Sequence, residues 1–217
     1  MNRLLKILFV AIIVKPVILI ILGLNIKGRQ KLPLKGPAII AANHNSHLDT
    51  MVMFSLYPLA KVHKLRPVAA ADYFLSNPLI AWFSLNVIGI IPLSRKGSTR
   101  KDLLKDNLFE GCHEALDNGD VLLIFPEGTR GEPEKTSKLK KGLYYLCKDR
   151  TDTKIIPVMT YGLGRALPRG EALFVPFICD VVVGDELPEF AASTELVELL
   201  SERYALLLNS CLTYKAK

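Results

Sequence analysis

The chain has 217 residues, of which 50% are hydrophobic and 23% are charged, and its formal net charge is +7. At this length we expect one large domain with a core of its own, and the mean hydropathy of +0.26 indicates a folded body with a membrane-facing part. The basic charge favours an anionic partner but does not choose among nucleic acid, a phospholipid surface and a phosphorylated substrate. The four cysteines lie far apart, which indicates neither a disulfide framework nor a zinc knuckle.

Residues 4–24 form an almost unbroken apolar run, which as a straight helix would rise about 31 Å and just cross a bilayer core. Lys15 would then lie near the hydrocarbon midplane, at a cost of roughly 2.5 to 3.5 kcal/mol, and Pro16 removes a backbone donor at the same place. A bent pair of short helices that dips into one leaflet is the alternative. In that arrangement five basic residues meet the anionic surface: Arg3, Lys6, Lys27, Arg29 and Lys31.

We therefore expect residues 1–30 to form a membrane-associated segment, either a helix or a helical hairpin, and residues 31–217 to form the main domain. A cleaved signal peptide fits worse, because a charge interrupts the apolar stretch and no small-residue cleavage site follows it. A buried core helix is a further alternative, although the run is longer than a core helix needs.

Short apolar runs bounded by glycine, proline or polar residues predict six strands, at residues 37–42, 67–71, 87–93, 121–125, 155–161 and 177–183. Stretches of helical length or spacing alternate with them, at residues 50–59, 78–85, 102–118, 141–148 and 194–212. This alternation is typical of an α/β domain with a mostly parallel sheet flanked by helices.

A run of mainly polar residues, NHNSHLD at 43–49, follows the first of these predicted strands. His44 and Asp49 are five positions apart, so on a continuous helix they would point about 140° away from each other. They can meet across a turn, with His44 at the strand end and Asp49 in the first turn of the next helix. The carboxylate would then hold one imidazole nitrogen and leave the other facing a substrate, which is the arrangement of a general base.

Other interpretations of the same run stay open. His47 and Asp49 form a second short polar pair, and Asp49 is also a good N-cap for the helix that follows. His44, His47 and Asp49 could instead bind a metal ion. No further cluster of ligands appears elsewhere in the sequence, so we expect no metal.

The run NHNSHLD resembles the Asn-His-x4-Asp block of the glycerophospholipid acyltransferases, which include the lysophosphatidic acid acyltransferases. Three more blocks resemble this family in the same order: GIIPLSR at 89–95, FPEGTR at 125–130 and IPV at 156–158. The resemblance implies a glycerol-3-phosphate acyltransferase-like fold, with His44 as the base and Asp49 as its orienting partner. It also implies a glycerol-phosphate site that includes Arg95, Glu127, Gly128, Thr129 and Arg130.

The chemistry of these residues agrees with that site. Gly128 would supply a turn at a strand end, where open α/β sheets present their sites, and the two arginines offer planar forks to phosphate. The polar stretch 131–141 is a candidate loop that closes over an anionic head group with three lysines: Lys138, Lys140 and Lys141. Glu127 has two alternative roles, accepting from substrate hydroxyls or holding an arginine. The apolar region 73–93, which contains Trp82, is core or part of an acyl tunnel.

We expect an acyltransferase that moves a fatty acyl group from acyl-CoA or acyl carrier protein to a lysophospholipid, with 1-acyl-sn-glycerol-3-phosphate as the best acceptor. No cofactor is expected beyond the acyl donor. The expected location is a phospholipid membrane, with the catalytic domain on the cytoplasmic face. The alternatives are another lysophospholipid or amino-lipid acceptor, or a non-catalytic lipid-binding protein. A nucleic-acid partner is not expected, because no motif of that class is present.

Overall fold

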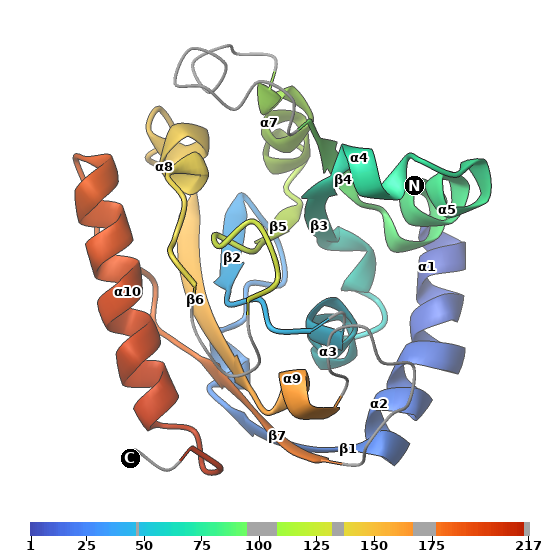
Figure 1. The fold of residues 1–217 in the computed structure, drawn as a ribbon. Coiled ribbons are helices and arrows are strands. Elements are labelled where there is room, and N and C mark those ends of the chain that lie inside the picture. Colours follow the sequence, from blue (N-terminus) through green and yellow to red (C-terminus); the bar gives the residue numbers. More distant parts are fainter. Residues whose placement is uncertain (47, 95–107, 132–136, 167–176, 215–217) are drawn as a thin grey trace.

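The computed structural model of the chain describes residues 1–46, 48–94, 108–131, 137–166 and 177–214. Seven strands form one sheet in the order β1-β7-β6-β2-β5-β3-β4 (Figure 1). The strands are β1 Leu22–Lys27, β2 Ala38–Ala42, β3 Leu65–Ala70, β4 Ile91–Leu93, β5 Val121–Ile124, β6 Lys154–Tyr161 and β7 Phe177–Val183.

Neighbouring strands are parallel throughout this sheet, except for the antiparallel pair of β6 and β7. The predicted α/β class, with a mostly parallel sheet and flanking helices, is therefore confirmed. β2 lies between β5 and β6, and its parallel neighbours end at the same edge as β2. Residues that follow β2, β5 and β6 are thus brought together.

The helices cover both faces of the sheet. The α-helices are α1 Arg3–Phe9, α2 Lys15–Ile21, α3 Leu48–Leu56, α4 Ala71–Phe74, α5 Pro78–Phe83, α7 Glu110–Asp117, α8 Gly142–Cys147, α9 Leu163–Ala166 and α10 Ser193–Asn209. Two π-helical segments, η1 Val10–Val14 and η4 Ser84–Ile88, and two 3-10 segments, η2 Arg29–Lys31 and η3 Val62–Lys64, complete the described elements. Figure 1 shows α8 and α10 on one side of the sheet and α1, α2 and α3 on the other.

The alternation of side chains along β2 divides the core in two. Ala38, Ile40 and Ala42 pack with residues of α3 and the N-terminal helix, whereas Ile39 and Ala41 pack with residues of α7, α8 and α10. All five residues of β2 are buried. The strand that leads into the polar run is therefore fixed from both faces.

Most predicted elements are found within a few residues of their expected bounds, and two differ. The strand predicted at residues 87–93 is only Ile91–Leu93, because η4 continues the α5 helix until Gly89 ends it with a φ of 75°. β1 was not predicted, since its first half is the end of the apolar run of residues 4–24. The first part of the helix predicted at 102–118 lies outside the described residues, and α7 accounts for its end.

The N-terminal helix runs from α1 through η1 into α2, and β1 begins directly after it. Across the described residues, no helix combines the length and the apolar character that crossing a membrane requires. β1 pairs with β7, so residues 22–27 of the expected membrane-associated segment belong to the sheet. The boundary at residue 30 and the membrane role of the segment stay predictions.

The position of Lys6 differs from the expected one. This residue was predicted to meet an anionic surface, but its side chain is fully buried between α1, β3 and η4. Its Nζ donates hydrogen bonds to the carbonyl oxygens of Leu65 at 2.5 Å and Ile88 at 2.7 Å, and it lies 4.4 Å from the centre of the Phe54 ring. These carbonyl groups and the ring compensate for the lost water, so Lys6 fixes the N-terminal helix to the domain.

Candidate active site at the end of strand β2

Asn43 is the first residue after β2, and its side chain continues the pairing of the sheet. Its backbone amide donates to Val158 O at 3.3 Å. Its side-chain amide then pairs with the backbone of Thr160 in both directions: Asn43 Nδ2 donates to Thr160 O at 2.8 Å, and Thr160 N donates to Asn43 Oδ1 at 2.6 Å. The side chain thus replaces a strand residue, and the main chain is free to turn away from the sheet at His44.

Asp49 lies in the first turn of α3 and is fully buried. One of its oxygens, Oδ2, accepts hydrogen bonds from the backbone amides of Asn45 at 2.8 Å and Ser46 at 2.9 Å. These two amides lie just before α3, so Asp49, the second residue of the helix, holds the turn that leads into it. Asp49 is not the N-cap that the sequence allowed, and Leu48 N donates to Ser46 Oγ at 3.3 Å. Asp49 Oδ2 also lies 2.8 Å from His44 Nδ1. The two side chains therefore meet across a turn, as their spacing predicts.

His44 is held in one orientation. Its ring stacks on Phe125 with a centroid distance of 4.1 Å and an interplanar angle of 19°. Because the Asp49 carboxylate accepts at Nδ1, the neutral imidazole carries its proton on that nitrogen and has its lone pair on Nε2. No hydrogen bond to another described residue involves Nε2, and the side chain is 20% exposed. This nitrogen is therefore available to a hydroxyl group that reaches the site.

Glu127 faces the interior and is 1% exposed. Oε1 accepts a hydrogen bond from His44 N at 3.0 Å, and Oε2 accepts one from Ser137 N at 3.0 Å. Burial raises the pKa of Glu127, while the bonds from His44 and Ser137 act in the opposite direction. The sequence left two roles open for this residue, accepting from substrate hydroxyls or holding an arginine, and both stay predictions. Its two oxygens have backbone partners within the protein, because the loop after β5 lies directly against the turn at His44.

The other residues of the FPEGTR block lie close to the hydrogen bond between Glu127 and His44. Gly128 has a φ of 71°, a backbone conformation that residues with a side chain rarely adopt, so glycine is favoured at this turn. Gly131 N donates to His44 O at 3.1 Å, which holds the end of the block beside the turn. Arg130 is half-buried, whereas Thr129 and Lys141 are exposed.

Two residues predicted from the sequence, Arg95 and His47, lie outside the described residues. Within the described ranges, no three His, Cys, Asp or Glu side chains are grouped so that they could hold a metal ion. Thr160 and the supporting side chain of Asn43 were not predicted as a pair. A threonine near the end of an apolar strand has no distinguishing sequence signal, and only the register of β2 with β6 brings the two together.

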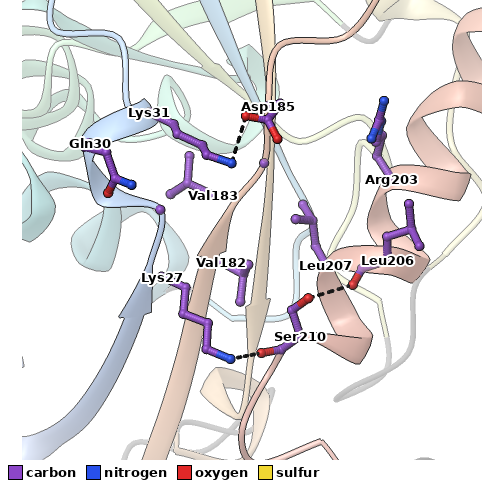
Figure 2. A pocket seen from close by; sticks show the side chains of 12 residues that line it. Lys27, Gln30, Lys31, Val182, Val183, Asp185, Arg203, Leu206, Leu207 and Ser210 are labelled. Atoms are coloured by element: carbon purple, nitrogen blue, oxygen red, sulfur yellow. Dashed lines mark hydrogen bonds and ion pairs between the residues drawn. The ribbon is translucent and has the colours of Figure 1, made fainter.

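A groove of about 410 Å³ lies elsewhere, between the ends of β1 and β7 and helix α10 (Figure 2). Lys31 at its rim pairs with Asp185 at 2.8 Å, and Lys27 donates to Ser210 O at 2.6 Å. None of the residues predicted for the site lines this groove. It is therefore separate from the cluster around His44.

The sequence of this chain is similar to those of known proteins. A model of the Acyltransferase family matches residues 23–161. A chloroplastic 1-acyl-sn-glycerol-3-phosphate acyltransferase of Arabidopsis thaliana is 31% identical over 68% of this chain, which spans 38% of that relative. A 1-acyl-sn-glycerol-3-phosphate acyltransferase of Chlamydomonas reinhardtii is 30% identical over 83% of this chain, which spans 52% of that relative.

The fold is also similar to a solved structure, the 1-acyl-sn-glycerophosphate acyltransferase PlsC from Thermotoga maritima. The TM-score is 0.70, and the match covers 99% of this chain and 82% of the other. The two sequences are 19% identical, so this similarity concerns the fold alone. The polar run after β2, the FPEGTR block and β6 all lie within the residues that the family model matches.

Proposed function

This chain belongs to the Acyltransferase family, and from that premise we propose that it moves a fatty acyl group from acyl-CoA or an acyl carrier protein to the free hydroxyl of a lysophospholipid. The preferred acceptor in this proposal is 1-acyl-sn-glycerol-3-phosphate, which gives phosphatidic acid. The observation that carries the proposal is the 2.8 Å contact between His44 Nδ1 and Asp49 Oδ2, because it leaves Nε2 to take a proton from a hydroxyl group.

In the proposed reaction, Nε2 of His44 removes the proton of the acceptor hydroxyl, and the alkoxide attacks the thioester carbonyl carbon. The carbon–sulfur bond then breaks, and the thiolate takes the proton from the imidazolium, so the products are an ester and a free thiol. Asp49 stabilises the imidazolium while it exists. Burial raises the pKa of Cys112 and of Cys147 to about 12, which argues against a cysteine nucleophile and favours direct transfer.

We place the acceptor's phosphate near Arg130, Thr129 and Lys141. Gly131 N donates to His44 O at 3.1 Å, so Arg130 is one residue from a backbone contact with the proposed base. A guanidinium group can bind phosphate with two parallel hydrogen bonds, and an ammonium group nearby adds charge. Arg95 is part of this proposal by the resemblance of its block.

We further propose that the protein docks on a phospholipid surface through an exposed apolar face. We define the apolar face as twelve large apolar side chains that are 37 to 82% exposed: Leu4, Leu8, Ile12, Ile13, Leu19 and Ile20 on the N-terminal helix, and Tyr73, Leu75, Leu79, Ile80, Trp82 and Phe83 around α4 and α5. Phe9 and Phe83 join the two groups with an edge contact of 5.2 Å. A surface of this kind on a folded domain is typical of membrane binding.

The proposed location is the cytoplasmic face of the membrane. The net charge of +7 favours the anionic lipids that are enriched there. All four cysteines are free and buried, which fits a reducing compartment.

The release of free thiol from a long-chain acyl-CoA in detergent tests the enzymatic proposal. We expect release that depends on 1-acyl-sn-glycerol-3-phosphate, that is lost in His44→Ala, and that is retained in His113→Ala, a change of the same kind on helix α7. Lysophospholipids with larger head groups and an acyl carrier protein donor are assayed in parallel. A preference for one of those acceptors would replace the substrate proposed here.

The outcomes also separate an enzyme from a lipid-binding protein. If the wild-type protein releases no thiol with either donor, or if His44→Ala is as active as the wild type, the proposed mechanism is wrong. A folded, inactive protein that still binds anionic vesicles would support the non-catalytic alternative.

A further inference from the structure

Thr160 is the second-to-last residue of β6 and is fully buried. Its hydroxyl Oγ1 lies 3.4 Å from Asp49 Oδ1 and 3.1 Å from Asn43 Oδ1. Asp49 and Asn43 flank His44 in the sequence, so one hydroxyl group contacts both ends of the turn that carries the proposed base. A threonine 111 residues away in the chain from Asp49 thus belongs to the same cluster.

The two oxygens of Asp49 differ in their partners. Oδ2 accepts from two backbone amides and lies against the imidazole, as described above. For Oδ1, the donor among the described residues is the hydroxyl of Thr160. A buried carboxylate oxygen without a donor is unfavourable. Thr160 provides the donor to Oδ1 that the turn itself lacks.

The hydroxyl group has one proton and two nearby acceptors. Asn43 Oδ1 already receives the backbone amide of Thr160 at 2.6 Å, so it keeps a partner when the hydroxyl points to Asp49. The hydroxyl lies nearer to Asn43 Oδ1, but the carboxylate of Asp49 is the stronger acceptor of the two. The arrangement therefore favours donation to Asp49.

We propose that Thr160 is a positioning residue, whose hydroxyl fixes the plane of the Asp49 carboxylate so that Oδ2 faces His44 Nδ1. The expected effect on turnover rests on the proposed function. The effect on the contact between Asp49 and His44 does not depend on that function. Thr160 touches neither acceptor nor donor in this proposal. Its loss is expected to lower kcat and to leave KM for the acceptor nearly unchanged.

The matched variants are Thr160→Val, which keeps the shape and removes the hydroxyl, and Thr160→Ser, which keeps the hydroxyl. Thr213→Val is the control, because Thr213 donates its hydroxyl to another buried carboxylate, that of Asp180, and not to Asp49. We expect Thr160→Val to lower kcat about tenfold, with KM changed less than about twofold. Thr160→Ser and Thr213→Val should keep kcat within about twofold of the wild type.

The second readout is the NMR resonance of the His44 Nδ1 proton, assigned with His44→Ala, which does not depend on turnover. Without the contact to Oδ1 the Asp49 carboxylate is held less firmly, and its hydrogen bond to His44 is expected to lengthen. This resonance should therefore move upfield and exchange faster with water in Thr160→Val, and should stay in place in Thr160→Ser. An unchanged resonance in Thr160→Val overturns the inference, whether or not the protein is active. An inactive wild-type protein with the expected NMR shift overturns the proposed function and leaves the positioning role supported.

Discussion

Oε1 of Glu127 accepts a hydrogen bond of 3.0 Å from the backbone amide of His44, so the end of β5 holds the end of β2 through one carboxylate. The other oxygen of Glu127 holds the amide of Ser137 in the same way. One side chain thus holds His44, which is 83 residues away in the chain, and Ser137, which is 10 residues away. Glu127 holds the backbone of His44 in place, a role beside the two that the sequence suggested, accepting from substrate hydroxyls or holding an arginine.

Glu127→Gln should lower kcat by about tenfold or more. The glutamine amide has only one acceptor oxygen, so one of the two backbone donors loses its partner, at a cost of about 1 to 3 kcal/mol. The thiol-release assay measures this effect. Glu186→Gln is the control, because Glu186 is exposed and pairs with Lys154 on the surface. Equal activity of both variants would show that the two hydrogen bonds of Glu127 do not position His44.

The stability of the same variant should depend on pH. Burial raises the pKa of Glu127 above its usual value of 4.5, so the folded state binds the proton more tightly than the unfolded state does. The wild type should therefore gain unfolding free energy relative to Glu127→Gln as the pH falls from 7 toward 4, and lose it again as the pH rises. Denaturant unfolding at several pH values measures the difference.

Arg130→Ala should raise KM for 1-acyl-sn-glycerol-3-phosphate at least about tenfold, because a phosphate loses a planar two-bond partner. Arg130→Lys should recover part of the affinity, since an ammonium group keeps the charge without the fork. Arg203→Ala is the control, because Arg203 lines the groove of Figure 2, away from His44. An unchanged KM in Arg130→Ala would contradict the assignment of this arginine to the phosphate.

Lys6→Met tests the buried ammonium group. Burial lowers the pKa of Lys6 well below its usual value of 10.5, with Arg66 adding to the effect. At pH values between the lowered pKa and 10.5, the unfolded chain binds the proton more tightly, so Lys6 makes the unfolding free energy rise with pH. The unfolding free energy of the wild type should therefore rise from pH 7 to pH 10 relative to that of Lys6→Met. Lys154→Met, at an exposed site, should show no such trend.

Leu79→Ser should weaken binding to vesicles of anionic phospholipid without changing the melting temperature. Leu79 is 81% exposed, so its replacement removes little packing within the protein, but it removes apolar area from the proposed contact with lipid. Leu212→Ser is the control, because Leu212 is 64% exposed near the opposite end of the chain. Sedimentation with vesicles measures binding. Equal losses in both variants would show that the apolar face has no special role.

The sequence was sufficient for the α/β class, for the turn that joins β2 to α3 and for the meeting of His44 and Asp49. Each of these depends on a local pattern, because strand and helix periods and a five-residue spacing are visible in a short window. The order of the strands and the antiparallel pairing of β7 were not predictable in this way, since they depend on contacts between distant segments.

Other features were hidden because their residue types have common alternative roles. A lysine in an apolar run suggests a group that reaches toward water, and burial of Lys6 depends on two carbonyl oxygens contributed by β3 and η4. The contact of Glu127 with the backbone of His44 depends on how closely two loops approach, which the sequence of the FPEGTR block does not show. Thr160 becomes notable only through the register of β6.

The π-helical segment η1 has a consequence for the phase of the N-terminal helix. The buried residues Lys6, Val10, Val14 and Ile18 recur at every fourth position. In a regular α-helix with 3.6 residues per turn, each such step rotates by about 40° too far, so three steps would move the buried stripe about 120° around the axis. The wider turn of η1 cancels this rotation. Deleting one residue between Val10 and Val14 would leave eleven positions from Lys6 to Ile18, which in a regular α-helix rotate only about 20° beyond three turns. The buried stripe would then keep its phase without η1, and the ammonium group of Lys6 would stay in the interior.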